Sequence, residues 1–174
     1  MAGFATKFES KKQEWTTPQE MWDRLDEEFH FTIDLAADEQ NTKCETYFSK
    51  ENDALSQDWF GVGWLNPPYG DGNSKLLKWV QKAFDETRKV GCTVVMLIPA
   101  RTNTRWWHHY CMQAAELRFI NGRPKFGNAV HGLPQPLALV IFRNDSQPLK
   151  VSSYEVLTST RKNHAVETTY ALAV

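Results

Sequence analysis

The tetrapeptide Asn66-Pro67-Pro68-Tyr69 is the part of the sequence best suited to chemistry. It follows the short apolar run 62–65, which is typical of a β-strand. Two prolines after a strand fix the backbone and prevent the hydrogen-bonded ladder from continuing. We therefore expect a rigid loop at the strand's end, from which Asn66 and Tyr69 project in fixed directions. An ordinary Pro-Pro turn without a chemical role is the alternative interpretation.

A basic segment rich in aromatic residues is a second candidate for a functional surface. Residues 101–126 have a net charge of +4, whereas residues 1–60 hold 14 acidic and 6 basic side chains, a net charge of −8. Because cations neutralise phosphates and flat rings stack on bases, residues 101–126 favour a nucleic-acid interface. A helix with charged flanks and buried aromatic rings is the alternative interpretation. The cations of this segment are Arg101, Arg105, Arg118, Arg123 and Lys125. The rings between them are Trp106, Trp107, His108, His109, Tyr110, Phe119 and Phe126.

Strands and helices alternate along the chain, and they must hold these residues in position. Because alternating elements with continuous apolar strands indicate a sheet covered by helices, we expect an α/β fold. The sheet would be mostly parallel and doubly wound, with helices on both faces. The predicted helices cover 17–29, 73–84 and 103–115. The predicted strands cover 31–34, 62–65, 92–98, 117–120 and 137–142.

The start of the first predicted helix carries two sequence signals. Thr17 and Glu20 match a T-x-x-E capping box, with Thr17 as the N-cap residue. Pro18 suits the first helical position, where its missing N–H costs nothing. We therefore expect the helix to begin directly after Thr17.

Three polar or turn-forming residues come just after predicted strands. Asp34, Asn66 and Pro99 follow strand ends in the sequence. In α/β sheets, ligands bind beyond the carboxyl ends of the strands, where the strand order reverses. We therefore expect these three positions to lie on one edge of the sheet and to form the ligand site.

Length and composition indicate one domain. With 174 residues, 41% of them hydrophobic and 24% charged, the chain can form one hydrophobic core and is too short for two. We expect a single domain over 1–174, with its core at about 15–143 and a tail or edge element at 144–174. No apolar run approaches the ~20 residues that span a bilayer, so we expect no membrane contact and a cytoplasmic location.

The cysteines and histidines do not indicate a metal centre. Three cysteines share no disulfide or metal-ligand spacing, and small buried hydrophobic residues in a reducing cytosol explain them. His108 and His109 are adjacent but have no third ligand in register, so we expect no metal site. The cysteines are Cys44, Cys92 and Cys111.

Asn-Pro-Pro-Tyr after a strand is the catalytic signature of methyltransferases that act on the amino groups of adenine, cytosine or glutamine amides. An ordered set of further segments, covering about residues 15–143, resembles the phage-type DNA N-6-adenine methyltransferases. The resemblance implies a Rossmann-like methyltransferase fold, S-adenosylmethionine as methyl donor and double-stranded DNA as partner, in a bacterial or phage-infected cell. The segments are Trp15-Thr-Thr-Pro, Phe31-Thr-Ile-Asp-Leu-Ala, Tyr47 to Leu55, Trp59, Leu97-Ile-Pro-Ala, Thr104-Arg-Trp-Trp and Gly122-Arg-Pro-Lys-Phe.

The resemblance also implies how the loop 66–69 acts on adenine. The adenine amino nitrogen is a poor nucleophile because its lone pair is delocalised into the ring. The Asn66 side-chain oxygen and the Pro67 carbonyl would each accept one amino proton, and this stabilisation grows as the nitrogen becomes positive. The Tyr69 ring would stack on the base, which must first flip out of the duplex. Pro68 completes the implied catalytic loop.

On the cofactor side, the resemblance implies roles for residues earlier in the chain. Thr17 and Pro18 would line the methionine end of the cofactor, and Asp34 would lie near the methionine part. Asp53 would accept a hydrogen bond from the amino group of the cofactor's adenine. Ala36 stands where the wider class has a glycine-rich loop, and its small side chain still permits close approach of the backbone. Thr17 as a helix cap alone and Asp53 as a turn former alone are the alternatives. The acidic ligand of the ribose stays open among Asp38, Glu39 and Glu45.

Several features of the substrate side stay open. Phe126 matches the aromatic residue that closes over the flipped base opposite Tyr69, and core packing is its alternative role. DNA recognition would come from the loops 70–75, 101–110 and 121–135, or from a second copy of the chain. Methylation of a protein glutamine amide is one alternative function. A catalytically silent module that binds nucleic acid or a nucleotide is another, although mere binding needs no rigid acceptor loop.

Overall fold

A computed structural model describes residues 16–69, 73–89, 91–127, 129–144, 149–156 and 170–171. The predictions for Trp15, for 70–72 in the loop 70–75 and for most of the segment 144–174 lie outside these residues. The helices are α1 Gln19–Phe29, α2 Asn73–Lys89 and α3 Arg105–His109, with the 3-10 turns η1 Ala54–Ser56 and η2 Cys111–Gln113. The strands are β1 Ile33–Asp34, β2 Val62–Leu65, β3 Thr93–Pro99, β4 Glu116–Asn121, β5 Leu137–Phe142, β6 Lys150–Glu155 and β7 Tyr170–Ala171.

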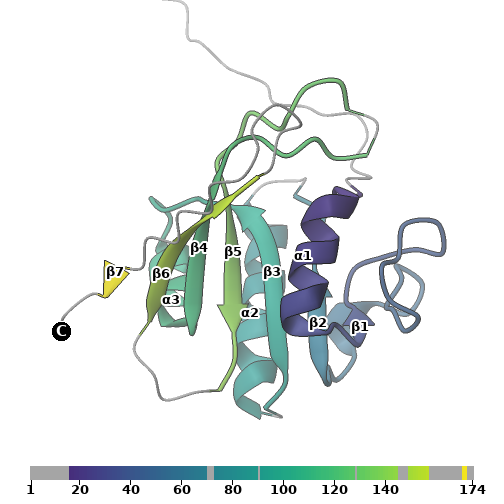
Figure 1. Ribbon diagram of the computed structural model, residues 1–174. Helices are drawn as coiled ribbons and strands as arrows, with labels where there is room; N and C mark the ends of the chain where they lie inside the picture. Colours follow the sequence, from purple (N-terminus) through teal and green to yellow (C-terminus); the bar gives the residue numbers. More distant parts are fainter. Residues whose placement is uncertain are drawn as a thin grey trace, which may run out of the picture.

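The strands described form one sheet in the order β1-β2-β3-β5-β4-β6-β7 (Figure 1). The first three strands are parallel neighbours. Strand β5 lies between β3 and β4 and is antiparallel to both, while β6 is parallel to β4. Strands β1, β2, β3, β4 and β6 therefore point in one direction, and their carboxyl ends share one edge of the sheet.

The prediction of an α/β fold is confirmed, but the sheet is less parallel than predicted. Among the pairs of described strands, β3–β5, β4–β5 and β6–β7 are antiparallel. Parallel neighbours need a long crossover, usually a helix, whereas antiparallel neighbours do not. The connection between β4 and β5 contains no helix in its described residues, so β5 returns antiparallel beside β4.

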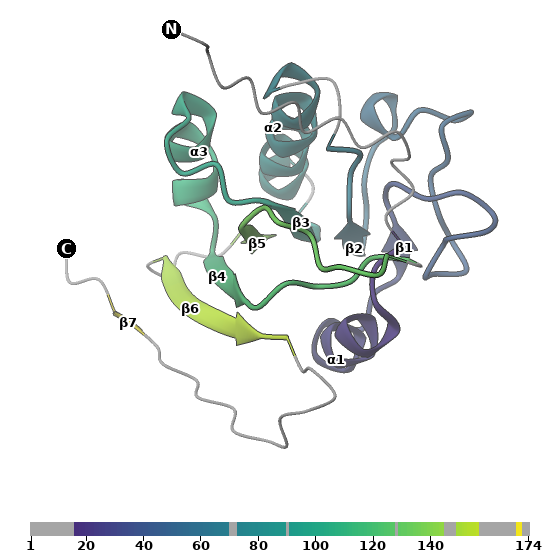
Figure 2. The same cartoon turned by 90° about the horizontal axis from the view of Figure 1, so that it is seen from above.

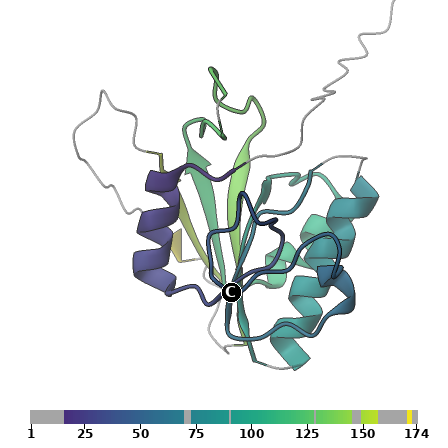
Figure 3. The same cartoon turned by 90° about the vertical axis from the view of Figure 1, so that its right-hand side faces the viewer.

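Helices cover both faces of the sheet, as predicted. Viewed from above and from the β1 edge, α1 lies on one face, and α2 and α3 lie on the other (Figures 2 and 3). Alternate residues of β3 bury on opposite faces. Val94, Met96 and Ile98 pack in the core beneath α2 and α3. Val95 and Leu97 pack in the core beneath α1.

The first helix begins later than predicted. Pro18 is its N-cap residue, with an extended ψ of 134°, and no side chain caps the helix. The capping box predicted at Thr17 is therefore wrong, and Pro18 precedes the first helical residue instead of occupying that position. Thr17 lies outside the helix, where its buried hydroxyl contacts Asn66 instead.

The helix predicted over 103–115 is divided into two short pieces. Thr104 caps α3, because its hydroxyl oxygen accepts the backbone N–H of Trp107 at 3.4 Å. Trp106 and Trp107 are both buried, so two adjacent residues point into the core. The chain leaves the helix at Tyr110, which is the N-cap residue of η2, so residues 103–115 do not form one continuous helix.

Strand β6 comes from the segment predicted as a tail or edge element, and it contacts α1. The Arg24 guanidinium donates to the carbonyl oxygen of Glu155 at 2.9 Å and lies over the Tyr154 ring. Tyr154 is buried and its hydroxyl lies 3.5 Å from the Met21 carbonyl oxygen. In the part of the chain that the structure describes, no helix has the length and apolar character of a membrane span.

Candidate active site

The residues predicted at strand ends meet at one edge of the sheet. Asp34 ends β1 and pairs with Trp64 of β2. Leu65 pairs with Met96 of β3, and Asn66 follows directly. The carboxyl ends of these parallel strands therefore bring Asp34 and Asn66 together, as expected.

Two adjoining cavities open at this edge. The larger has a volume of about 360 Å³ and the smaller of about 30 Å³, and both are lined by Ala36 and Asn41. Together they collect Thr17, Asp34, Ala36 and Asp53 of the predicted cofactor residues, whereas Pro18 lines neither. The larger cavity is also lined by Ala37, Asp38, Phe48, Ser49, Lys50, Asp53, Ala54, Pro68 and Trp79. The smaller is also lined by Thr16, Thr17, Asp34, Lys43, Trp64 and Asn66.

Asp34 is a buried carboxylate at the wall of the smaller cavity. Its side chain is 3% exposed. The two carboxylate oxygens accept backbone N–H groups, Oδ1 from Ala36 at 3.3 Å and Oδ2 from Lys43 at 3.1 Å. Burial raises the pKa of Asp34 to about 6, although these two hydrogen bonds oppose the rise. The two backbone donors therefore hold the carboxylate at the wall of the cavity, and it ionises near pH 6.

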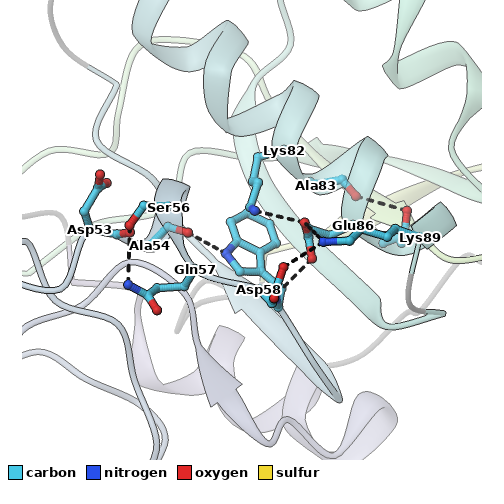
Figure 4. A network of polar contacts seen from close by, with 11 residues as sticks. Asp53, Ala54, Ser56, Gln57, Asp58, Lys82, Ala83, Glu86 and Lys89 are labelled. Atoms are coloured by element: carbon cyan, nitrogen blue, oxygen red, sulfur yellow. Dashed lines mark hydrogen bonds and ion pairs between the residues drawn. The ribbon is translucent and has the colours of Figure 1, made fainter.

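Asp53 lies in a strained turn at the wall of the larger cavity. Its φ of 44° is left-handed, a conformation that costs a residue with a side chain free energy and is common at functional sites. The Asp53 backbone carbonyl accepts the Ser56 hydroxyl at 2.8 Å, which closes the turn. The carboxylate is exposed and does not cap η1. Figure 4 shows it directed away from the polar network behind the turn.

That polar network joins the Asp53 turn to α2. The indole N–H of Trp59 donates to the Ala54 carbonyl at 2.8 Å. The backbone N–H of Trp59 donates to the Glu86 carboxylate at 3.0 Å, and the Lys82 ammonium donates to the same carboxylate at 2.9 Å (Figure 4). Burial alone would raise the pKa of Glu86, but these two donors outweigh it and lower the pKa. A buried carboxylate of α2 therefore anchors the turn.

The loop 66–69 brings Asn66 to the smaller cavity and Pro68 to the larger one. Pro67 is buried, while Asn66 and Tyr69 are half-buried. The Tyr69 hydroxyl lies 2.7 Å from Oδ1 of Asn66 and 2.9 Å from the carbonyl oxygen of Leu97. Nδ2 of Asn66 donates to Oγ1 of Thr17 at 3.3 Å. Burial raises the pKa of the Tyr69 phenol, so the hydroxyl keeps its proton.

Two aromatic residues of the larger cavity were missed by the sequence reasoning. Phe48 is brought to the site by the segment that runs beside β1, where its N–H donates to the Asp34 carbonyl at 2.8 Å. Trp79 of α2 stacks on Trp59 at 6.3 Å between ring centroids. The segment beside β1 pairs with it through an isolated bridge between Asp34 and Tyr47. Because such short pairing produces no alternation of apolar and polar residues, the sequence did not indicate the position of Phe48.

Among the acidic residues left open for a ribose, Asp38 lines the larger cavity, and Glu39 and Glu45 do not. The Asp38 carboxylate is oriented by the residues that follow it. Oδ1 accepts the backbone N–H groups of Gln40 and Asn41, and Oδ2 accepts the Asn41 amide at 2.7 Å. The described residues hold no group of three or more His, Cys, Asp and Glu side chains placed to bind a metal ion.

The basic segment divides into buried rings and exposed cations. Trp106, Trp107 and Phe126 are buried in the two cores, which matches the buried-ring interpretation for these three. Arg118 forms ion pairs with Glu28 and Glu116. Arg105, Arg123 and Lys125 are exposed, and Arg101 is half-buried.

The exposed cations lie near the active edge of the sheet. Because β3 and β4 point the same way, the segments that follow them begin at the same edge as Asn66. Figure 1 shows the connection between β4 and β5, in green, beyond that end of the sheet. The Gly127 N–H donates to the Thr16 carbonyl at 2.9 Å, which joins this connection to the chain before α1. The cations therefore border the candidate site.

Comparison with known proteins gives a consistent family. The family model for DNA N-6-adenine-methyltransferase (Dam) matches residues 5–166. The chain is 32% identical over 149 residues to the DNA N-6-adenine-methyltransferase of Haemophilus phage HP1, covering 79% of this chain and 84% of that protein. It is 34% identical over 110 residues to the DNA N-6-adenine-methyltransferase of Escherichia phage T1, covering 61% of this chain and 44% of the longer phage protein.

An α/β sheet with cavities at the carboxyl ends of its parallel strands is the arrangement of a small-molecule-binding α/β domain. Within that class, the match over residues 5–166 is specific. The chain belongs to the DNA N-6-adenine-methyltransferase family, whose members are adenine-specific DNA methyltransferases. The family inferred from the loop 66–69 and the segments around it is confirmed.

Proposed function

We propose that this chain transfers a methyl group from S-adenosylmethionine to the N6 amino group of adenine in double-stranded DNA, within a Rossmann-like methyltransferase core. The observation that carries the proposal is the position of Asn66. It lines the smaller cavity, which adjoins the larger cavity lined by Asp53. An acceptor for the target amino group thus lies beside a cavity suited to a nucleoside.

The residues of the larger cavity suit the adenosine part of the cofactor. Phe48 and Trp79 offer flat apolar surfaces for the adenine ring, and the Asp53 carboxylate accepts its amino group. The Asp38 carboxylate, which its neighbours orient, accepts the ribose hydroxyls. Ala36 lines both cavities, and its small side chain leaves room for the cofactor to extend from one cavity into the other.

The residues of the smaller cavity suit the methionine part. The Asp34 carboxylate attracts the α-ammonium group there, and the segment 16–18 lies alongside. When bound, the cofactor supplies a methyl group on a positively charged sulfur. Asn66 at the same cavity is therefore close to the position from which the methyl group leaves.

The loop 66–69 acts on the target base. Oδ1 of Asn66 and the Pro67 carbonyl accept the two amino protons of the flipped adenine, which directs the nitrogen lone pair toward the methyl group. These hydrogen bonds strengthen as positive charge develops on the nitrogen, so they lower the barrier more than they stabilise the bound base. Tyr69 stacks on the base and offsets part of the few kcal/mol that flipping costs.

The cations around the site bind the DNA backbone. Arg101, Arg105, Arg123 and Lys125 follow strands that end at the active edge, and phosphate contacts of this kind fix position without reading sequence. Phe126 is 2% exposed, so we assign it to packing beneath this surface. Acting on such DNA, the chain works in the cytoplasm of a bacterial or phage-infected cell.

A methyl-transfer assay with labelled S-adenosylmethionine tests the proposal against its alternatives. Duplex DNA, RNA and a glutamine-containing protein serve as parallel substrates. We expect label in the adenine of DNA alone. Label in protein would instead support the glutamine methyltransferase, and no label in any substrate at saturating cofactor would support the silent binding module.

A further inference from the structure

The Asn66 side chain must be held, because the prolines fix only its backbone. Pro67 and Pro68 restrict the main chain, but rotation about the side-chain bonds of Asn66 can exchange its amide oxygen and nitrogen. The two ends are chemically opposite, since the oxygen accepts and the NH₂ group donates. Only the oxygen can accept an amino proton of adenine. Something other than the loop backbone must therefore fix the amide.

Two hydroxyl groups contact the two ends of this amide. The Tyr69 hydroxyl lies 2.7 Å from Oδ1, and the Thr17 hydroxyl oxygen accepts Nδ2 at 3.3 Å. The three side chains come from the loop after β2 and from the segment before α1. Asn66 is thus bounded on both sides by groups that are 49 and 3 residues away in the sequence.

The Thr17 hydroxyl is well placed to restrict the amide. Thr17 is 5% exposed, so its side chain is largely shielded from bulk solvent. It does not cap α1, whose N-cap residue is Pro18. The preceding carbonyl, of Thr16, is fixed by the N–H of Gly127 at 2.9 Å. The hydrogen bond to Asn66 therefore accounts for a buried polar group that the helix does not use.

We propose that Thr17 and the Tyr69 hydroxyl are positioning residues that hold the Asn66 amide with its oxygen available to the target adenine. The inference deepens the proposed function, because it requires Asn66 to be the acceptor of the amino proton. In this arrangement the Thr17 hydroxyl binds the Asn66 amide. Only the backbone and the methyl group of Thr17 then line the cofactor cavity. Misplacement of a reacting group by a small distance can lower turnover about 100-fold.

The test compares Thr17→Val, which keeps the side-chain shape without the hydroxyl, with Thr17→Ser, which keeps the hydroxyl. We expect Thr17→Val to lower kcat about 10- to 100-fold, with Thr17→Ser close to the parent. Calorimetry with S-adenosylhomocysteine should give the same Kd for all three proteins. Thr93→Val is the matched control, because Thr93 begins β3 at the opposite edge of the sheet, and its kcat should not change.

A second comparison uses the Asn66→Asp variant, which has no amide nitrogen at this position, as the starting protein for Thr17→Val. In the Asn66→Asp background the side chain has two equivalent oxygens, so its orientation no longer decides whether an acceptor faces the base. Thr17→Val should therefore lower kcat less in that background than in the parent. Tyr69→Phe keeps the ring but removes the other hydroxyl, and it should lower kcat in the parent in the same way as Thr17→Val.

Each other outcome overturns the proposal. Unchanged kcat in Thr17→Val, or a weaker Kd for S-adenosylhomocysteine with kcat unchanged at saturation, makes Thr17 a cofactor ligand or a wall of the cavity. If a thermal melt shows that Thr17→Val does not fold, the kcat of Tyr69→Phe becomes the test. A normal kcat for Tyr69→Phe would also overturn the inference. Near-normal turnover in Asn66→Ala would refute the acceptor role of Asn66, and no label in DNA from the parent protein would refute the proposed function itself. Both results are distinct from full activity in Thr17→Val alone.

Discussion

The Asp34 carboxylate is buried at the end of β1, and this burial sets the pH at which it can hold a cation. Burial raises its pKa from 3.8 to about 6, since charge is disfavoured away from water. The ionised form therefore destabilises the fold, a cost that is absent below about pH 4 and complete above about pH 6. A cofactor ammonium group beside it would offset that cost.

We predict that S-adenosylmethionine binds more weakly as the pH falls through about 6. Because only the ionised Asp34 attracts the ammonium group, the Kd near pH 5 should be about tenfold higher than near pH 8. Calorimetry in buffers of different ionisation enthalpy should also detect proton release on binding near pH 6. Asp34→Asn should remove the pH dependence, and an Asp34→Asn protein with the parent's pH profile would contradict this role.

Asp53 differs from Asp34 because its carboxylate is exposed and is positioned by the backbone of its turn. The family resemblance indicated both aspartates, and the position of Asp34 after a predicted strand indicated it independently. Neither argument showed how the two carboxylates are held. The left-handed φ of Asp53 and the N–H donors to Asp34 belong to the geometry of irregular loops, which residue types and periodicity do not specify. The same holds for Phe48 and Trp79, which no motif indicated.

The turn η1 and helix α2 act as one unit through Glu86. The Glu86 side chain is 5% exposed, and its carboxylate accepts hydrogen bonds from the Trp59 N–H and the Lys82 ammonium. Because its pKa is lowered, the stability that it contributes is present above its ordinary pKa of 4.5 and is lost as the pH falls through the lower folded-state value.

We predict that Glu86→Ala lowers the free energy of unfolding by about 1–3 kcal/mol at neutral pH, because a buried N–H loses its partner. The Asp53 turn should loosen with it, so the affinity for S-adenosylmethionine should fall as well. Asp53→Ala should weaken the same affinity by about 1.5–3 kcal/mol and leave the fold intact. Urea titration and calorimetry on both variants measure these effects, with Glu27→Ala, an exposed position on α1, as control.

If Glu86→Ala has the parent's urea midpoint, the carboxylate does not anchor the turn. If the midpoint falls and cofactor affinity stays unchanged, the anchor has no part in shaping the cavity.

At the scale of elements, continuous apolar patterns gave the most reliable predictions. The strands β3 and β5 lie within one residue of the predicted bounds, because their side chains bury on both faces. The region 103–115 was predicted as one helix, because it contains no proline or glycine to signal the break at Tyr110 between α3 and η2. The antiparallel position of β5 depends on pairing between distant strands, which local periodicity does not specify.

For the molecule as a whole, the exposed cations and the active site lie at the same edge of the sheet. Lys125 lies in the connection that follows β4, whereas Lys150 begins β6 at the opposite edge. A duplex lying over the active edge would bring its phosphates near Lys125 and leave Lys150 away from the DNA.

We predict that Lys125→Ala weakens binding to duplexes of any sequence and lowers the slope of log K against log salt by about one unit. Lys150→Ala should leave both quantities unchanged. Fluorescence anisotropy over a range of salt concentrations measures the slope. Equal slopes for Lys125→Ala and the parent would show that Lys125 makes no phosphate contact and is an ordinary solvated surface residue.

Single-turnover methylation of an adenine-containing duplex by Asn66→Ala tests the central claim most directly. If Oδ1 of Asn66 accepts an amino proton in the transition state, the rate should fall ~100- to 1000-fold, with cofactor affinity and melting temperature unchanged. Asn66→Asp keeps an acceptor and should retain more activity than Asn66→Ala. A near-normal rate in Asn66→Ala would mean that the loop 66–69 is only a turn and that the account of catalysis given above is wrong.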